Sequence, residues 1–164
     1  MPTTLLVLAS IATGLYAGFL VTFLIAIMPA LKRLPDRQFT AAMRRINEVV
    51  PGPAFGLLFL AAPALTAAAL ATGRDGRSSG ATWLLAAGLA AAVLSHLVTL
   101  AGNIPLNSAL AKAESDDTAD ADTADAEARA AFEPRWNQLH RVRTGLSTAA
   151  FVLVTVATAT ATAT

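Results

Sequence analysis

The segment just before the last apolar run gathers side chains of several chemical kinds. On a helix, Trp136, His140 and Arg143 share one face at spacings of four and three residues. Asn137 lies three residues before His140 and Thr144 four after it, which places both on an overlapping face. An imidazole can take up a proton, an amide and a guanidinium can hold a developing anion, and an indole can stack on an aromatic ring. An interfacial tryptophan–arginine anchor needs neither Asn137 nor His140, so we interpret the segment as a site.

A second polar motif, Asn103-Ile-Pro-Leu-Asn107, closes another apolar run. Pro105 has no backbone N–H and frees carbonyls of the preceding turn. The two amides can refill those bonds, or they can point donors at a ligand; general rules favour a simple helix end. His96 is the one ionisable residue in the middle of an apolar run, and Thr99 shares its face. It is either a neutral histidine bonded to a neighbouring helix, or a base or metal ligand on the floor of a polar pocket.

The elements that position these residues are four apolar runs. Hydrophobic residues make up 55% of the 164-residue chain and charged residues 14%, below the roughly 25% charged fraction of soluble domains. A helix needs about 20 residues to cross the hydrocarbon core, and backbone groups in lipid must be satisfied within the segment. The sequence therefore predicts an all-α, integral membrane four-helix bundle, a single domain over 1–164, with spans at about 4–31, 54–73, 81–102 and 144–164.

The connections between the spans differ in character. Between the first two spans, one apolar stripe predicts a short helix that lies in the membrane interface; its members are Phe39, Met43, Ile46 and Val50. The third connection contains a Thr-Ala-Asp near-repeat, so we expect an acidic flexible loop over 113–131. A helical start at Glu133 should follow it, because Pro134 suits a first helical position.

The placement of Lys and Arg predicts how the chain is oriented in the membrane, and a stripe of small residues predicts where helices associate closely. Loops one and three hold ten of the twelve Lys and Arg residues. The positive-inside tendency then makes these loops cytoplasmic and both termini external, in a cell membrane. Ser10, Gly14 and Gly18 form a small-residue stripe, which serves packing inside the bundle or, less favoured, a homo-oligomer. The chain has no cysteine and no basic surface that would indicate a nucleic-acid partner.

Several motifs, taken in chain order, carry a resemblance to a known family. They are Met28-Pro29, Met43-Arg-Arg-Ile-Asn47, Asn103-Ile-Pro-Leu-Asn107 and Trp136-Asn-x-x-His140-x-x-Arg143-Thr144. With the four spans, they resemble the anthrone oxygenase family over essentially the whole chain; the acidic tract looks like an insertion. The resemblance implies oxidation of a small, hydrophobic, electron-rich molecule by dioxygen in natural-product biosynthesis, such as an anthrone, without an obvious cofactor.

For such a reaction we expect a base, oxyanion donors and a dry pocket. His140 would be the base, since an unperturbed imidazole has a pKa of about 6.5. Arg143 would stabilise the anion, and Trp136 would stack on the substrate. The expected oxyanion donors are Asn103, Asn107 and Asn137. The expected further substrate contacts are Arg44, Asn47, Thr144 and His96.

Two alternatives stay open at this point. Copper or iron, which imidazole suits, could be held by His96 and His140 together with an amide or carboxylate. The chain could also be a non-catalytic membrane protein that binds a small molecule or assists another protein. Both alternatives use the same polar motifs, so the motifs alone do not separate them.

Overall fold

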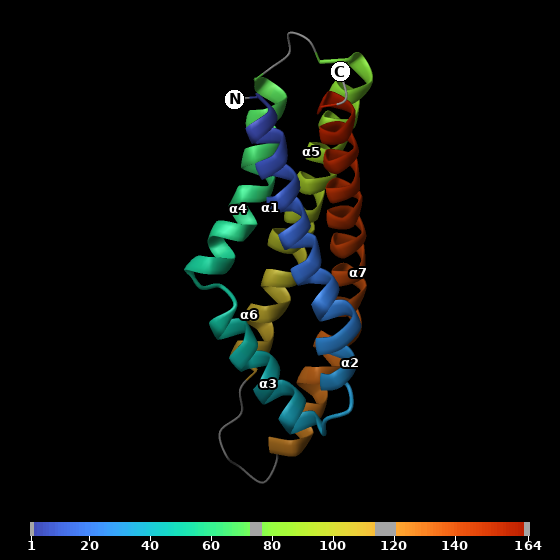
Figure 1. The fold of residues 1–164 in the computed structure, drawn as a ribbon. Helices are drawn as coiled ribbons and strands as arrows, with labels where there is room; N and C mark the ends of the chain where they lie inside the picture. Colours follow the sequence, from blue (N-terminus) through green and yellow to red (C-terminus); the bar gives the residue numbers. More distant parts are fainter. Residues whose placement is uncertain (1, 73–76, 114–120, 163–164) are drawn as a thin grey trace.

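The structure, a computed structural model, describes residues 2–72, 77–113 and 121–162. Every regular element in these ranges is a helix (Figure 1), which confirms the predicted all-α fold. In chain order they are the α-helices and π-helical turns α1 (Pro2–Thr22), η1 (Phe23–Ile27), α2 (Met28–Leu31), α3 (Asp36–Val49), α4 (Pro53–Ala71), α5 (Ser79–Val98), η2 (Thr99–Asn103), α6 (Ile104–Lys112) and α7 (Ala121–Thr162).

Four continuous helical stretches are long and apolar enough to cross a membrane, as predicted. They are Thr3–Leu31, Pro53–Ala71, Ser79–Lys112 and Asp122–Ala161. The first joins α1, η1 and α2, and the third joins α5, η2 and α6. In Figure 1 the two chain ends lie together at the top of the bundle, and α3 lies at the opposite end. α7 packs along α5 and α1, whereas α4 packs on α1 and less extensively on α5.

Small residues on α1 let α7 approach closely. Ser10 Oγ and Thr158 Oγ1 are 2.9 Å apart, and a Cβ added at Gly14 would lie 2.8 Å from the Phe151 ring. Two members of the small-residue stripe therefore pack inside this chain. A Cβ added at Gly18 would meet no atom within 4 Å. Association of two chains through the stripe stays a prediction.

The third span does not end at Pro105, so the expected helix end is wrong. The helix widens into η2 and continues as α6. Pro29 in the first span has the same setting, because it also stands two residues after a π-helical turn, η1. A proline lacks the N–H of the helix ladder and its ring clashes with the carbonyl four residues earlier. A π-helical turn makes room for it, which lets both spans continue.

The predicted flexible loop over 113–131 is wrong over 121–131, where the chain is already part of α7. Residues 114–120 lie outside the described part of the chain. Asp125, from the acidic near-repeat, is 5% exposed. It accepts hydrogen bonds from Thr40 Oγ1 at 2.8 Å and from Arg44 Nη1 at 3.1 Å. These tertiary contacts explain why α7 begins well before Glu133, where the helix was expected to start.

The helix predicted in loop one forms as α3, but its apolar stripe faces protein. Phe39 and Met43 are fully buried, and they belong to one hydrophobic cluster with Phe132 and Trp136 of α7. A helix lying on the membrane alone would leave this stripe against lipid. In this structure α3 instead covers the end of the bundle.

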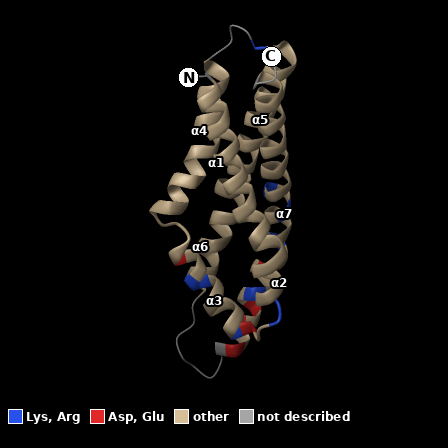
Figure 2. Ribbon diagram, viewed as in Figure 1, with Lys and Arg blue, Asp and Glu red and all other residues tan. Residues whose placement is uncertain are grey.

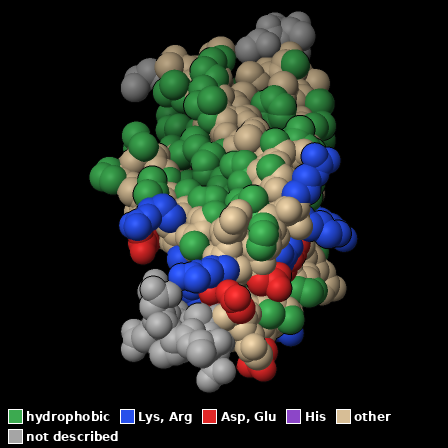
Figure 3. Space-filling view, turned by 90° about the horizontal axis from the view of Figure 1, so that it is seen from below, with side chains coloured by type: hydrophobic (Ala, Val, Ile, Leu, Met, Phe, Trp, Pro, Cys, Tyr) green, Lys and Arg blue, Asp and Glu red, His purple; other side chains and the backbone are tan. Residues whose placement is uncertain are grey.

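Charged side chains gather at the end of the bundle that carries α3 (Figure 2). Seen from below, that end shows basic and acidic side chains close together, next to hydrophobic surface (Figure 3). Arg129 of α7 pairs with Asp36 at 2.9 Å and with Glu133 at 2.7 Å. It also donates to the carbonyls of Lys32 and Leu34. This arginine therefore ties the turn between α2 and α3 to α7.

Candidate functional site

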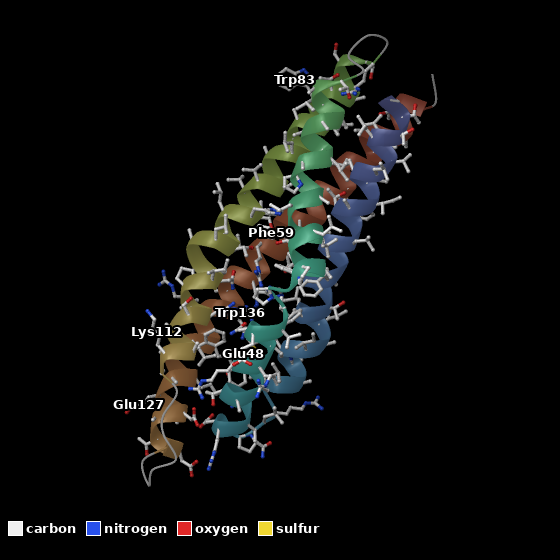
Figure 4. All side chains as sticks on the ribbon, turned by 90° about the vertical axis from the view of Figure 1, so that its left-hand side faces the viewer. Glu48, Phe59, Trp83, Lys112, Glu127 and Trp136 are labelled. Carbon is white, nitrogen blue, oxygen red and sulfur yellow. The ribbon has the colours of Figure 1, made fainter. Side chains whose placement is uncertain are left out.

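A cavity of about 200 Å³ lies between α1, α4, α7 and the η2–α6 segment, and α3 closes it from the charged end. Its aromatic walls are Phe19, Phe23, Phe55, Phe59 and Trp136. Its polar lining residues are Asn47, Thr99, Asn103, Asn107 and Arg143. Figure 4 shows Phe59 near the middle of the bundle and Trp136 closer to the charged end. An apolar chamber with a few polar groups is the usual form of a small-molecule site.

The two π-helical turns supply part of this lining. Phe23 belongs to η1, and Thr99 and Asn103 are the first and last residues of η2. A π-helical turn holds one residue more than an α-helical turn, so it changes the faces on which the following side chains lie. The turns that precede Pro29 and Pro105 thereby help to place the cavity's polar residues.

Arg143 is the one ionisable residue among the described residues that line the cavity. It is 8% exposed, and its Nε donates to His140 Nδ1 at 3.0 Å. Its Nη1 donates to Thr99 Oγ1 at 3.3 Å, and its guanidinium carbon lies 5.3 Å from the centre of the Trp136 ring. A fixed cation in apolar surroundings is suited to hold an anionic oxygen of a ligand.

His140 lies behind Arg143 and does not line the cavity. Its ring is completely buried and stacks on Trp136 with 4.8 Å between ring centres. Because Nδ1 accepts from Arg143, the ring proton sits on Nε2, which donates to the Leu20 carbonyl at 3.1 Å. Both ring nitrogens are thus engaged with protein. The arrangement makes His140 a support for the guanidinium.

Two amides of the lining keep unused hydrogen-bonding atoms. Asn103 Nδ2 donates to the Trp136 carbonyl at 3.2 Å, but Asn103 Oδ1 and Asn47 Nδ2 are buried with no hydrogen-bond partner in the part of the chain that the structure describes. Buried polar atoms without a partner are rare in native proteins. A ligand with a donor and an acceptor would satisfy both. Asn107 has another task, because its Oδ1 accepts from Trp136 Nε1 at 2.8 Å and fixes the indole.

Three predicted site residues stand away from the cavity lining. Arg44 is used by the fold: besides its pairing with Asp125, it donates to the carbonyls of Leu110 and Ala113 at the end of α6. Thr144 donates back to its own helix, to the His140 carbonyl. The third, Asn137, is half-buried on α7.

His96 is also outside the lining, although Phe59 brings it near. Its Nδ1 lies 2.7 Å from the Ala92 carbonyl and its Nε2 lies 2.6 Å from the Phe59 carbonyl. The ring packs against Phe59 and Tyr16 at 4.1 and 4.9 Å between centres. Its nitrogens face carbonyl oxygens, and those of His140 face Arg143 and a carbonyl. Within the described residues no three of His, Cys, Asp and Glu group for a metal ion, and all four ring nitrogens of the two histidines face protein atoms.

Reasoning from the sequence missed most of the cavity wall. Phe19 and Phe23 lie four residues apart, as do Phe55 and Phe59, and this spacing is the signal that could have identified them. Tyr16, the one tyrosine of the chain, was also missed. It is 2% exposed, and its hydroxyl has no hydrogen-bond partner among the described residues. A lone tyrosine inside a span places a polar hydroxyl within the membrane. It therefore indicates a functional site as strongly as His96 does.

Comparison with known protein families gives a match over most of the chain. A family model described as anthrone oxygenase matches residues 39–153. No curated protein and no solved structure matches the chain. The matched segment contains most of α3, all of α4 to α6 and most of α7, with both polar motifs. Because the match covers well over half of the sequence, the chain belongs to the anthrone oxygenase family.

Proposed function

We propose that the protein is a membrane-embedded oxygenase that oxidises a small, hydrophobic, electron-rich aromatic molecule, such as an anthrone, with dioxygen. One observation carries the proposal. The Arg143 guanidinium is held in an aromatic-walled cavity by His140 and Thr99. Anionic oxygen on a planar aromatic ring is the ligand that such a cation and such walls would stabilise together. Family membership supports oxygenase chemistry in general.

The reaction follows from the acidity of the substrate. An anthrone-type molecule carries a CH₂ group opposite a carbonyl, between two aromatic rings. Loss of one proton to a solvent base gives a phenolate, and the phenolate transfers one electron to dioxygen. The two radicals combine at the former CH₂ carbon to a peroxide, which takes up a proton. Loss of water then gives a second carbonyl, so that CH₂ and O₂ become C=O and H₂O.

The residues of the cavity take distinct parts in this scheme. Arg143 pairs with the phenolate oxygen and so makes the substrate more acidic. Asn103 Oδ1 accepts from a hydroxyl of the substrate, and Asn47 Nδ2 donates to a second oxygen. Trp136 and the phenylalanines stack on the rings. We assign His140 a positioning role in place of the base, because both of its ring nitrogens are already bonded.

Oxygen uptake by the protein in lipid nanodiscs, with a panel of anthrones and hydroquinones, tests the proposal. Arg143→Gln should lower kcat/KM by about 100-fold or more, since one oxyanion donor contributes that much in other enzymes. Arg141→Gln is the matched control, because Arg141 is exposed on the same helix and does not line the cavity. Chelators should leave turnover unchanged, as the electron-rich anion reduces dioxygen without a metal. Wild-type uptake no greater than that of empty nanodiscs would refute the proposal.

A non-catalytic binder is the second candidate, and the unpartnered Asn47 and Asn103 atoms favour it equally. In a Trp83→Phe background, which leaves Trp136 as the single tryptophan, quenching of tryptophan fluorescence by the same ligands measures binding directly. A binder would show saturable quenching in wild type with no oxygen consumption. An oxygenase would show both, and both would weaken in Arg143→Gln.

We further propose that the protein resides in the cell membrane with its charged end in the cytoplasm and both termini outside. The cavity would then lie in the cytoplasmic half of the bundle. The support is the placement of ten of the twelve Lys and Arg residues in loops one and three.

A further inference from the structure

A second hollow lies beside the cavity, on the outer side of α1 and α4. It is a groove of about 750 Å³ with apolar lining from these two helices alone, including Gly18 and Leu58. Phe19 lines both the groove and the cavity. In a membrane this side of α1 and α4 faces lipid. Phe19 therefore stands between lipid and the site.

The division between the two hollows is thin. On α4, Phe55, Gly56 and Phe59 face the cavity, whereas the intervening Leu57 and Leu58 face the groove. The rings of Phe19 and Phe55 meet at 5.4 Å between centres. Beside them the helices carry no side chain at two positions. A Cβ added at Gly18 or at Gly56 would meet no atom of another described element within 4 Å, so there is open space on each side of the ring pair.

The ring of Phe19 can move without a change in the fold. Phe19 is half-buried on α1, and rotamer changes of such side chains are fast compared with backbone rearrangement. Of the four spans, α4 has the smallest share of its residues buried inside the protein. It packs on α1 and α5 without extensive contact to α7. Its first turn begins at Pro53, the last residue of Pro51-Gly-Pro53. The contact between α1 and α4, called the α1–α4 seam below, is therefore the part of the bundle that opens most easily.

The α1–α4 seam also lies at a depth in the membrane at which an aromatic ligand would collect. Phe55 is in the first turn of α4, which begins at Pro53, so it sits near the membrane–water interface at the charged end. Aromatic rings with a polar end concentrate at this depth in a bilayer. We propose that an aromatic ligand reaches the cavity sideways from the bilayer, between α1 and α4, when the Phe19 ring swings aside. The proposal rests on the proposed function for the identity of the ligand, but the passage itself does not require turnover.

Irreversible labelling of a cysteine inside the cavity tests the passage, since the chain has no cysteine of its own. Thr99→Cys places a thiol in the lining next to Arg143, which favours the thiolate. The probe is N-phenylmaleimide, a small aromatic reagent dissolved in the lipid of nanodiscs. In this background Gly18→Leu, on the groove side, and Gly56→Leu, on the cavity side, should each slow labelling at least tenfold. Phe19→Ala should speed it.

The matched control is Gly145→Leu. Gly145 is exposed on α7, also has open space around an added Cβ, and lines neither hollow; this variant should label at the parental rate. Ile104, a lining residue that is 45% exposed, marks the rival route beside α6. Equal rates in all glycine variants, or a slow rate in Ile104→Phe alone, would overturn the proposal. Labelling needs no oxygen, so it reports on the passage alone. Oxygen uptake reports on the activity alone, so failure of the passage and failure of the proposed function are distinguishable.

Discussion

Arg143 is held from several directions, and each contact restricts a different movement. His140 accepts from Nε, Thr99 accepts from Nη1, and the Trp136 ring lies beside the guanidinium plane. The indole is itself fixed by Asn107. A guanidinium that is already oriented loses little freedom when an anion binds, and this preorganisation is where electrostatic catalysis gains most.

The role of His140 is the sharpest prediction at the scale of single residues. His140→Ala removes the acceptor of Arg143 Nε. We expect kcat/KM for substrate oxidation to fall about 10- to 100-fold, since a hydrogen bond to a charged group contributes roughly 1.5–3 kcal/mol. His140→Asn keeps a side-chain oxygen that can accept from Nε and should recover part of the loss. In both variants the pH–rate profile should keep the shape of the wild type.

Both variants would behave differently from this expectation if His140 were the catalytic base. If His140 removed the proton, the asparagine variant would be as inactive as the alanine variant. The acidic limb of the wild-type pH–rate profile would also disappear from both. That pair of results would restore the role expected from the sequence.

Of the described polar residues that line the cavity, all but Thr99 were among the site residues expected from the sequence, but the order of their depth was not expected. Trp136, His140 and Arg143 share a helical face as predicted, yet His140 is covered by the other two. A helical face does not tell which of its members is outermost. The phenylalanine walls were missed for another reason: spans that are apolar all round show no contrast between an inner and an outer face.

At the scale of elements, a buried ion pair adds to the apolar packing that attaches α3 to the bundle. Arg44 and Asp125 have side chains that are 11% and 7% exposed, and Arg44 also holds the end of α6 through two carbonyls. Three elements therefore meet at one guanidinium. Since α3 supplies Asn47 to the cavity, this contact also positions the wall that closes the site.

Asp125→Asn should loosen this attachment. It leaves Arg44 without its carboxylate partner, and breaking a buried ion pair costs about 3 kcal/mol. We expect a lower midpoint of thermal unfolding in detergent and weaker ligand binding, because α3 carries Asn47. The control is Glu127→Gln on the next turn, where the side chain is exposed. Equal melting of the two variants would show that the pair does not hold α3.

A second element-scale prediction concerns the contact of α5 with α7. A Cβ at Gly88 would lie 2.8 Å from Val154 Cγ2 and 3.4 Å from the Ala150 carbonyl. Gly88→Ala should therefore destabilise the bundle by roughly 1–3 kcal/mol. Gly145→Ala, with open space at its Cβ, should stabilise by about 0.5–1 kcal/mol. Thermal unfolding of both variants provides the comparison, and a Gly88→Ala protein as stable as wild type would mean that the helices can move apart freely.

The four spans were predictable because length and hydropathy alone decide them. The ends of the spans could not be predicted in the same way. A π-helical turn absorbs Pro105, and the sequence offers no local sign that the helix can widen there. The acidic start of α7 depends on Thr40 and Arg44, which are distant in the chain. In both places tertiary structure overrides the local preference of the residues.

At the scale of the whole molecule, the bundle is asymmetric along its axis. Most charged side chains and α3 lie at one end (Figure 2), whereas both chain ends, the last turn of α4 and the first turn of α5 lie at the other (Figure 1). The cavity is lined by α3 and the first turn of α4, so it lies nearer the charged end. The orientation of the protein thus decides which compartment faces the site.

Single cysteines introduced into the cysteine-free chain measure that orientation. Gln38→Cys lies on the exposed side of α3, and Ser79→Cys lies exposed at the start of α5, at the opposite end. Because basic loops are retained on the cytoplasmic side, a membrane-impermeant maleimide should label Ser79→Cys in intact cells and Gln38→Cys only after permeabilisation. The reverse pattern would place the cavity in the outer half of the membrane. The solvent base that takes the substrate's proton would then be on the outside, and turnover would follow external rather than cytoplasmic pH.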